Sequence, residues 1–264
     1  MDLGIKGKTA LVAAASDGLG KAVALRLAAE GCHVVICARN EQRISAALRE
    51  IQLASPEVRC EGFVTDLGSA EDIEQLGEQL RQRQLGIDIL VNNAGGPPPG
   101  FFEDIEDSQW QQAFDLTLMS AIRLTRLVLA DMRARGWGRV INITSYSVKQ
   151  PMVEMMLSNS IRMGVVGWAK TLSNEVACDG VTVNNVCPGW TRTGRVDQLL
   201  KARARSTGME PEEIERTLLA AIPSKRIGEV GEFADVVAFL ASQNASYVTG
   251  TTLPIDGGAV SAAM

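Results

Sequence analysis

The chain has 264 residues, of which 46% are hydrophobic, and a net charge of −5 at pH 7. This length suits one large α/β domain, so we expect a single domain over residues 1–264. The charge, without a basic patch, argues against nucleic acid as a partner, and no apolar run approaches the roughly 18 residues of a membrane span. We expect a cytoplasmic protein with no membrane partner. The five cysteines lack CxxC spacing and favour free thiols, with no metal site.

Predicted strands and helices alternate along the chain. The strands are expected near residues 8–14, 33–38, 58–64, 88–92, 138–144, 181–187 and 251–255. The helices are expected near residues 18–30, 40–53, 69–83, 107–135, 156–178 and 230–242. This alternation predicts an α/β, Rossmann-type, doubly wound parallel sheet of about seven strands with helices on both faces. Residues 189–229 interrupt it with helical pieces at 195–206 and 211–221, and we expect this insertion to be a substrate lid.

The first strand runs into a turn of small residues, which a helix follows. The turn and the helix start bring backbone N–H groups and the positive end of a helix to one point, which suits a phosphate. Arg39 follows the second strand, 19 residues after Gly20. A dinucleotide-binding fold reads the ribose 2′ position there, and an arginine accommodates a 2′-phosphate. Asp17 would repel a 2′-phosphate, whereas Arg39 would attract it. On the basis of Arg39 we expect NADP to be preferred to NAD.

Four further motifs lie later in the chain. Asn92-Asn93-Ala94-Gly95 follows the fourth predicted strand, Cys187-Pro188-Gly189 follows the sixth, and Thr249-Gly250 and Asp256-Gly257-Gly258 flank the last. With the turn at Gly18 and with Asp66, they resemble the short-chain dehydrogenase/reductase family, 3-oxoacyl-carrier-protein reductases in particular, from about Leu3 to Gly258. The resemblance implies an NAD(P) cofactor and a homotetramer or homodimer. The cofactor-binding residues that it implies are Ala14, Ser16, Asp17, Gly18, Leu19, Arg39, Asp66, Leu67, Asn93, Ala94, Gly95, Arg162, Pro188, Gly189, Thr191 and Thr193. Ala14 stands where the family has its first glycine.

The family's catalytic residues are an Asn, a Ser and a Tyr-x-x-x-Lys pair, in which Tyr is the acid or base and Lys holds the ribose. Ser145 matches the Ser, whereas Ser158 and Arg162 stand at the Tyr and Lys positions and Thr117 at the Asn position. Ser158 and Arg162 share one helix face. Arg162 can donate to ribose hydroxyls but cannot pass on a proton, and a serine is a far weaker acid than a phenol. We expect Thr117 to be a core residue whose hydroxyl bonds its own helix backbone.

Tyr146 directly follows Ser145 at a strand end. It is either a packing aromatic of the loop 146–153 or the phenol that replaces the missing one. Residues that suit an apolar pocket, or equally core or interface packing, are Met152, Met155, Met156, Met163, Trp190, Leu199, Leu200, Leu218 and Leu219. The pocket interpretation predicts an apolar carbonyl or alcohol substrate.

Three functions remain open at this point. The first is an NAD(P)-dependent oxidoreductase that interconverts a ketone or aldehyde and an alcohol, with an atypical site of Ser145, Ser158, Arg162 and Tyr146. The second is a non-redox enzyme similar to halohydrin dehalogenases, which also have Arg in place of Lys but keep the Tyr and lose the glycine turn. The third is a catalytically silent dinucleotide-binding protein.

Overall fold

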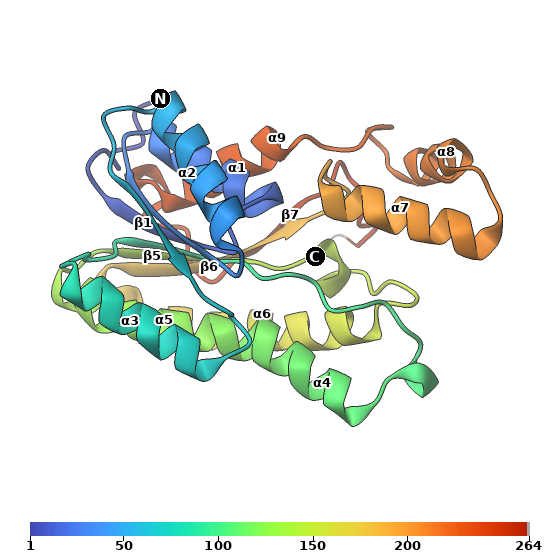
Figure 1. The fold of residues 1–264 in the computed structure, drawn as a ribbon, viewed down its shortest axis with the longest axis horizontal. Helices are drawn as coiled ribbons and strands as arrows, with labels where there is room; N and C mark the ends of the chain where they lie inside the picture. The colour runs from blue at the N-terminus through green and yellow to red at the C-terminus, as the bar shows by residue number, and fades with distance from the viewer. Residues whose placement is uncertain (263–264) are drawn as a thin grey trace.

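Seven parallel strands form the centre of the computed structural model, which describes residues 1–262 (Figure 1). The strands are β1 (Thr9–Ala13), β2 (His33–Ala38), β3 (Cys60–Val64), β4 (Ile89–Asn92), β5 (Gly138–Ile143), β6 (Val181–Pro188) and β7 (Thr252–Ile255). Their order is β3-β2-β1-β4-β5-β6-β7. The chain therefore changes direction between β1 and β4, and ligands of such sheets bind where the order reverses, at the carboxyl ends of the strands.

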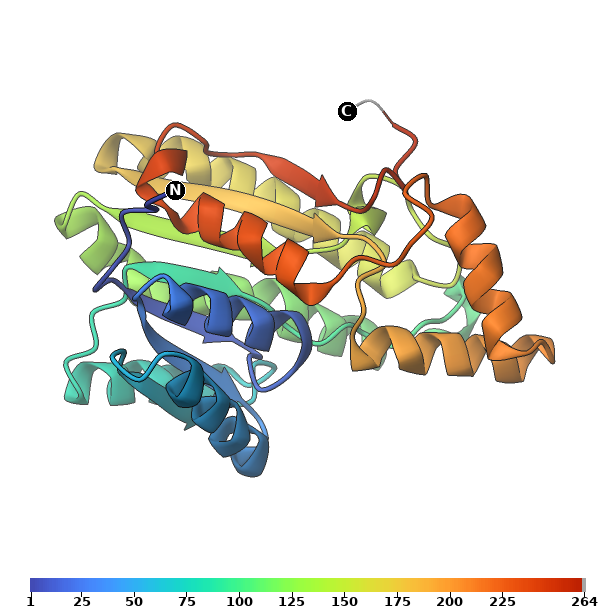
Figure 2. The same cartoon turned by 90° about the horizontal axis from the view of Figure 1, so that it is seen from above.

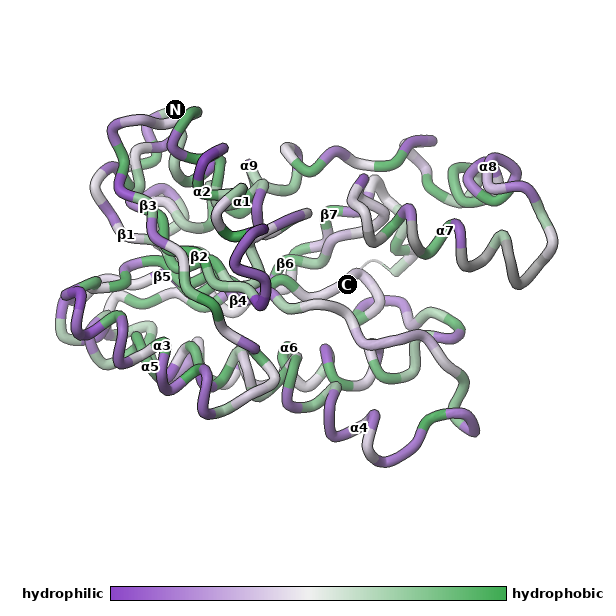
Figure 3. The backbone as a smooth tube through the Cα atoms, viewed as in Figure 1, coloured by the Kyte–Doolittle hydropathy of each residue, from purple (hydrophilic) through white to green (hydrophobic). Residues whose placement is uncertain are grey.

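Helices cover both faces of the sheet (Figure 1). One face carries α1 (Gly18–Ala29), α2 (Glu41–Ala54) and α9 (Val230–Ala241), and the other carries α3 (Ala70–Gln82), α4 (Asp107–Ala113), α5 (Ser120–Ala134) and α6 (Met156–Val176). In β1, Ala10 and Val12 pack in the first layer, whereas Leu11 and Ala13 pack in the second. Because both faces of the central strands β1, β2 and β4 are buried, these strands are largely apolar, and Figure 3 shows hydrophobic residues at the centre of the molecule. The fold class predicted from the sequence is confirmed.

The predicted lid forms a separate pair of helices, α7 (Gly194–Thr207) and α8 (Pro211–Ala221), which extends beyond the carboxyl ends of the strands (Figure 2). The buried side chains between them form a small apolar cluster of their own, made of Val196, Leu200, Ile214 and Ile227. Trp190, Leu218 and Leu219 pack against this cluster. The pair thus has its own packing, apart from the two core layers.

The helix predicted over 107–135 is confirmed, since residues 107–134 are helical without a gap, but one turn of it is not α-helical. After α4 the chain makes a π-helical turn, η2 (Phe114–Met119), and only then enters α5. The wider turn shifts the buried face of the helix, so that Phe114 is 37% exposed while Thr117 is buried. Single π-turns inside α-helices are frequent at functional sites. The periodicity of the sequence could not reveal this one, because both helices on either side of it are regular.

Three asparagines join neighbouring strands through their side chains. Asn92, Asn142 and Asn185 occupy the same register position on β4, β5 and β6. Asn92 Nδ2 donates to Asn142 Oδ1 (2.8 Å), and Asn142 Nδ2 donates to Asn185 Oδ1 (3.0 Å). Asn185 Nδ2 continues the row to Thr252 Oγ1 on β7 (3.1 Å). Buried amides must be paired, so this row fixes the register of the strands that lead to the site.

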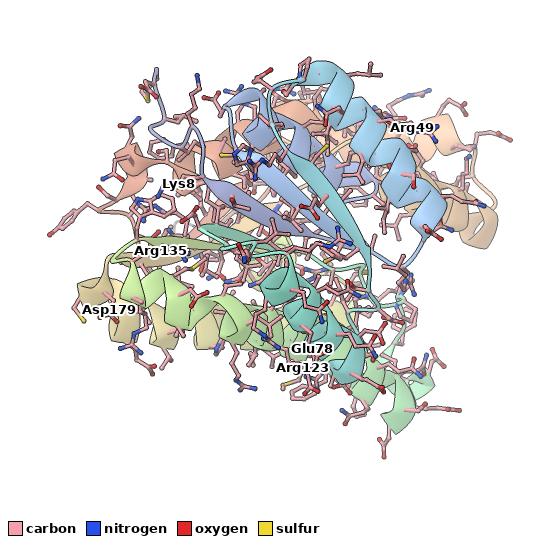
Figure 4. All side chains as sticks on the ribbon, turned by 60° about the vertical axis from the view of Figure 1, so that its left-hand side comes forward. Lys8, Arg49, Glu78, Arg123, Arg135 and Asp179 are labelled. Atoms are coloured by element: carbon pink, nitrogen blue, oxygen red, sulfur yellow. The ribbon has the colours of Figure 1, made fainter. Side chains whose placement is uncertain are left out.

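At the amino ends of the strands, opposite the site, Asp88 pairs with Lys8 (3.8 Å) and Arg135 (3.4 Å), both labelled in Figure 4. No helix within residues 1–262 is both long and apolar enough to span a bilayer.

Candidate active site

The turn after β1 has the form that a bound phosphate requires. Gly18, at φ +57°, begins α1, and the amide N–H groups of Leu19 and Gly20 have no acceptor within the described residues. A Cβ on Gly20 would lie 2.6 Å from the carbonyl oxygen of Ala14, so only glycine fits there. The free amides and the positive end of α1 meet at one point, which suits an anion.

Ala14 adopts a left-handed conformation, with φ +47°. This conformation favours glycine, the residue that the family has at this position, and it is strained for alanine. The carbonyl oxygen of Ala14 accepts a hydrogen bond from Asn93 Nδ2 at 3.3 Å, which ties the turn to the end of β4. The substitution is therefore accommodated without loss of the turn.

The other predicted cofactor residues lie at the same edge of the sheet. Asp66 and Leu67 follow β3, Asn93, Ala94 and Gly95 follow β4, Pro188 and Gly189 close β6, and Thr191 and Thr193 lead into α7. A Cβ on Gly18 would lie 3.7 Å from Thr193 Cγ2, so the base of the lid touches the turn, and open space surrounds Gly95. The structure thus brings these segments together, although the Leu67 side chain is buried in the core.

Arg162 connects the two serines of the predicted site. It is 7% exposed, and its Nε donates to Ser158 Oγ at 3.2 Å, one helical turn earlier on α6. Its Nη1 donates to the carbonyl oxygens of Ile143 (3.1 Å) and Thr144 (3.0 Å), the two residues before Ser145. The guanidinium is therefore bound to the end of β5, a contact that the sequence did not predict.

Both serine oxygens accept one internal hydrogen bond. Ser158 Oγ accepts from Arg162 Nε, and Ser145 Oγ accepts from Ser147 N at 3.1 Å, where it caps the short helix η3 (Tyr146–Val148). An oxygen that accepts from its own chain still has its hydroxyl proton to donate. Each of the two hydroxyls can therefore still act as a hydrogen-bond donor.

Tyr146 lies toward β6 and the lid. Its hydroxyl oxygen accepts from Trp190 Nε1 at 3.1 Å. Burial raises the pKa of the Tyr146 phenol; the bond from Trp190 opposes this effect, and the charge of Asp256 adds to it. Within residues 1–262, no hydrogen bond joins the Tyr146 hydroxyl to Ser145 or Ser158. Tyr146 as a replacement acid thus stays a prediction.

The structure corrects the expectation for Thr117. Its hydroxyl does not bond the helix backbone: Thr117 Oγ1 is buried and has no partner within the described residues. The neighbouring Ser120 makes such a bond instead. Thr117 lines a cavity of about 10 Å³, room for about one water molecule, together with Asn92 and Arg162.

Asn92 Oδ1, the end of the asparagine row, is likewise buried without a partner in the described part of the chain. Sequence reasoning counted Asn92 only as part of a motif and missed that it faces the site. A polar residue inside an apolar strand was the signal that could have revealed it.

The remaining pocket candidates are divided. Met163 is 50% exposed on α6, whereas Leu200 is buried between the lid helices. The interpretation of the methionines as a pocket therefore does not hold for Met163, because it faces outward.

This sheet, with its glycine turn and polar strand ends, defines a dinucleotide-binding oxidoreductase fold. The family model described as enoyl-(acyl carrier protein) reductase matches residues 13–260. The 3-oxoacyl-[acyl-carrier-protein] reductase of Haemophilus influenzae is 34% identical over 257 residues, which cover 96% of this chain and 98% of that protein.

Solved structures show the same likeness. L-sorbose reductase of Gluconobacter frateurii, solved with NADPH and L-sorbose, is 32% identical, with a TM-score of 0.94 and coverage of 99% and 100% of the two chains. NAD⁺-bound xylitol dehydrogenase is 25% identical, with a TM-score of 0.88 and coverage of 96% and 99%. The chain belongs to the short-chain dehydrogenase/reductase family and is an NAD(P)-dependent oxidoreductase of carbonyl and alcohol groups, as predicted.

Proposed function

We propose that this enzyme prefers NADPH and interconverts an apolar ketone or aldehyde and its alcohol. In its active site Ser145 acts together with Ser158 and Arg162, which replace the family's Tyr and Lys. The observation that carries the proposal is the position of Arg162, whose guanidinium binds Ser158 and the carbonyls that precede Ser145. Two hydroxyl donors and one fixed positive charge therefore act at the carboxyl end of β5.

The residues present fit the cofactor. The Leu19 and Gly20 amides would hold its pyrophosphate, open space at Gly95 would admit it, and Arg39 would take the 2′-phosphate. Within residues 1–262 the Arg39 side chain has no hydrogen-bond or ion-pair partner, so its guanidinium is available. The bound nicotinamide supplies or accepts the hydride.

The chain's own groups act on the substrate oxygen. Ser145 and Ser158 donate hydrogen bonds to it, and Arg162 stabilises negative charge that develops there. A guanidinium does not serve as a proton donor in proteins, so Arg162 positions Ser158 and does not pass on a proton. Tyr146 is the candidate proton donor: its oxygen accepts from Trp190, which leaves its own proton to give.

The apolar substrate class is supported by the lid. The core of the lid is packed within itself, but Trp190, Leu218 and Leu219 at its edge are only partly buried, and the lid lies beyond the carboxyl ends of the strands. The relatives include an L-sorbose reductase and a 3-oxoacyl-[acyl-carrier-protein] reductase, and the lid is the part of the chain that favours the apolar alternative. We also propose a homotetramer or homodimer, which size-exclusion chromatography with light scattering tests.

The first experiment is a fluorescence titration with NADPH and NADH, followed by a panel of ketones and aldehydes with the preferred cofactor. We expect NADPH to bind more tightly, and Ser158→Ala and Ser145→Ala each to lower kcat by about 100-fold without changing NADPH affinity. Ser160→Ala, the same change at an exposed position of α6, is the matched control. Unchanged kcat in both Ser158→Ala and Ser145→Ala would overturn the proposed site, and equal affinity for the two cofactors would overturn the preference.

A further inference from the structure

Two arginines stand within five residues at the end of β2. Arg39 follows the strand directly, and Arg43 lies in the first turn of α2. Asn40 caps the helix between them, because its Oδ1 accepts from the Arg43 amide at 2.9 Å. The amides of Glu41 and Gln42 have no acceptor within the described residues, so the N-terminus of α2 is open to an anion.

Arg43 reaches from α2 to the cofactor turn. Its Nη1 lies 4.0 Å from Asp17 Oδ2, and the two side chains are 68% and 66% exposed. Asp17 Oδ1 meanwhile accepts from the Gly18 amide at 2.8 Å. The carboxylate of Asp17 is thus held between the N-terminus of α1 and the guanidinium of Arg43.

A third cation nearby is already engaged. Lys21 Nζ binds the Glu50 carboxylate at 2.9 Å and links α1 to α2. Arg39 and Arg43 are therefore the cations at this corner that can bind a phosphate, and only Arg43 has a competing anion beside it.

We propose that Arg43 is a second ligand of the cofactor 2′-phosphate, and that Asp17 is the anion that Arg43 holds until the cofactor binds. The inference rests on the proposed preference for NADPH. Binding then exchanges one anion for another at Arg43, with the phosphate placed between Arg39, Arg43 and the start of α2.

The exchange has a direction because the two anions differ in charge. A phosphate monoester carries about −1.5 to −2 charges at pH 7 and presents three acceptor oxygens to an arginine fork. An aspartate carries one charge, and an exposed ion pair of this kind is weak. The phosphate therefore displaces Asp17, yet the charge of Asp17 still lowers affinity for NADPH.

The proposal predicts opposite effects for the two residues. Arg43→Ala should weaken NADPH binding by about 10-fold and leave NADH within about two-fold, since only NADPH carries the 2′-phosphate. Asp17→Asn keeps the cap on Gly18 and removes the charge. It should tighten NADPH binding by about three- to ten-fold, and NADH binding by less.

The test is isothermal titration of the purified full chain with NADPH and NADH, and with adenosine 2′,5′-bisphosphate against adenosine 5′-monophosphate, which carry no nicotinamide. Arg49→Ala is the matched control, because Arg49 lies further along the same helix and points into solvent (Figure 4). Arg39→Ala reports on the cofactor preference itself. The four substituted side chains, Asp17, Arg39, Arg43 and Arg49, are all exposed, so we expect every variant to fold. Circular dichroism of each variant checks this.

The outcomes separate the two proposals. Loss of 2′-phosphate selectivity in both arginine variants, with a gain in Asp17→Asn, supports the exchange. Loss in Arg39→Ala alone would overturn the role of Arg43 and Asp17 and leave the NADPH preference intact. Equal binding of NADPH and NADH by the unmodified protein would contradict the preference and the exchange together.

Discussion

The guanidinium of Arg162 donates from Nε to Ser158 Oγ at 3.2 Å, across one turn of α6. The same group binds the last carbonyls of β5 at 3.0 and 3.1 Å. One side chain thus fixes a helix, a strand end and the hydroxyl orientation of Ser158. Removing it should affect stability and activity together.

Arg162→Ala should lower the free energy of unfolding by about 2–4 kcal/mol, because it leaves the buried carbonyls of Ile143 and Thr144 without their donor. Urea denaturation measures the change. Arg162→Lys should recover only part of it, since a single ammonium cannot replace the planar fork. Ser160→Ala, at an exposed position of the same helix, should stay within about 0.5 kcal/mol of the unmodified protein. A similarly small cost for Arg162→Ala would show that these bonds contribute little.

Ala14→Gly should stabilise the protein by about 0.5–1 kcal/mol. Alanine at φ +47° is strained, and the relief outweighs the larger freedom of glycine in the unfolded chain. Ala22→Gly, within α1, should instead destabilise by about 0.5–1 kcal/mol, because glycine weakens helix interiors. Thermal unfolding compares the two. A loss of stability in both variants would mean that the turn does not strain Ala14.

Thr117 and Thr125 form a natural pair, since both are buried threonines of the same helical segment. Thr125 Oγ1 accepts from Asn92 Nδ2 at 3.1 Å, whereas Thr117 Oγ1 has no partner within residues 1–262. Thr125→Val should cost about 1–3 kcal/mol, and Thr117→Val should be neutral or slightly stabilising. Chemical denaturation of both variants tests the difference. An equal cost at Thr117 would indicate a water molecule bound to its hydroxyl in the small cavity.

Tyr146 should ionise at higher pH than an ordinary tyrosine, because burial raises the pKa of its phenol. A raised pKa favours the neutral form in the folded state. This preference stabilises the folded state fully at pH values below the pKa of tyrosine in the unfolded chain, which is about 10. The stabilisation is lost as the pH rises through the higher pKa of Tyr146 in the folded protein. Phenolate absorbance during an alkaline titration reports this step. Tyr146→Phe should remove the rise in absorbance that occurs at the higher pH, and Tyr247→Phe should retain it. If that rise survives in Tyr146→Phe, it does not come from Tyr146.

Much of the fold could be predicted from the sequence. Apolar runs such as that of β1, and the turn residues that bound them, are local signals, so the strands and the helix starts were placed within about two residues. The glycine turn was found because small residues, Gly18 and Gly20 among them, stand between an apolar strand and a helix, and the structure shows that a Cβ at Gly20 would clash with Ala14. The π-helical turn at Phe114–Met119 was not predicted, since such a turn leaves no local mark in the sequence.

The sequence by itself determined which chemical groups reach the carboxyl ends of the strands, because alternation and motif spacing depend on neighbouring residues along the chain. Only the tertiary structure decided how these groups are paired. Arg162 turns to the carbonyls of β5, Thr117 is left unpaired within the described residues, and Arg43 meets Asp17 across two helices. Each pairing depends on distances between segments far apart in the chain, which packing of the whole sheet and its helices sets and which no local pattern encodes.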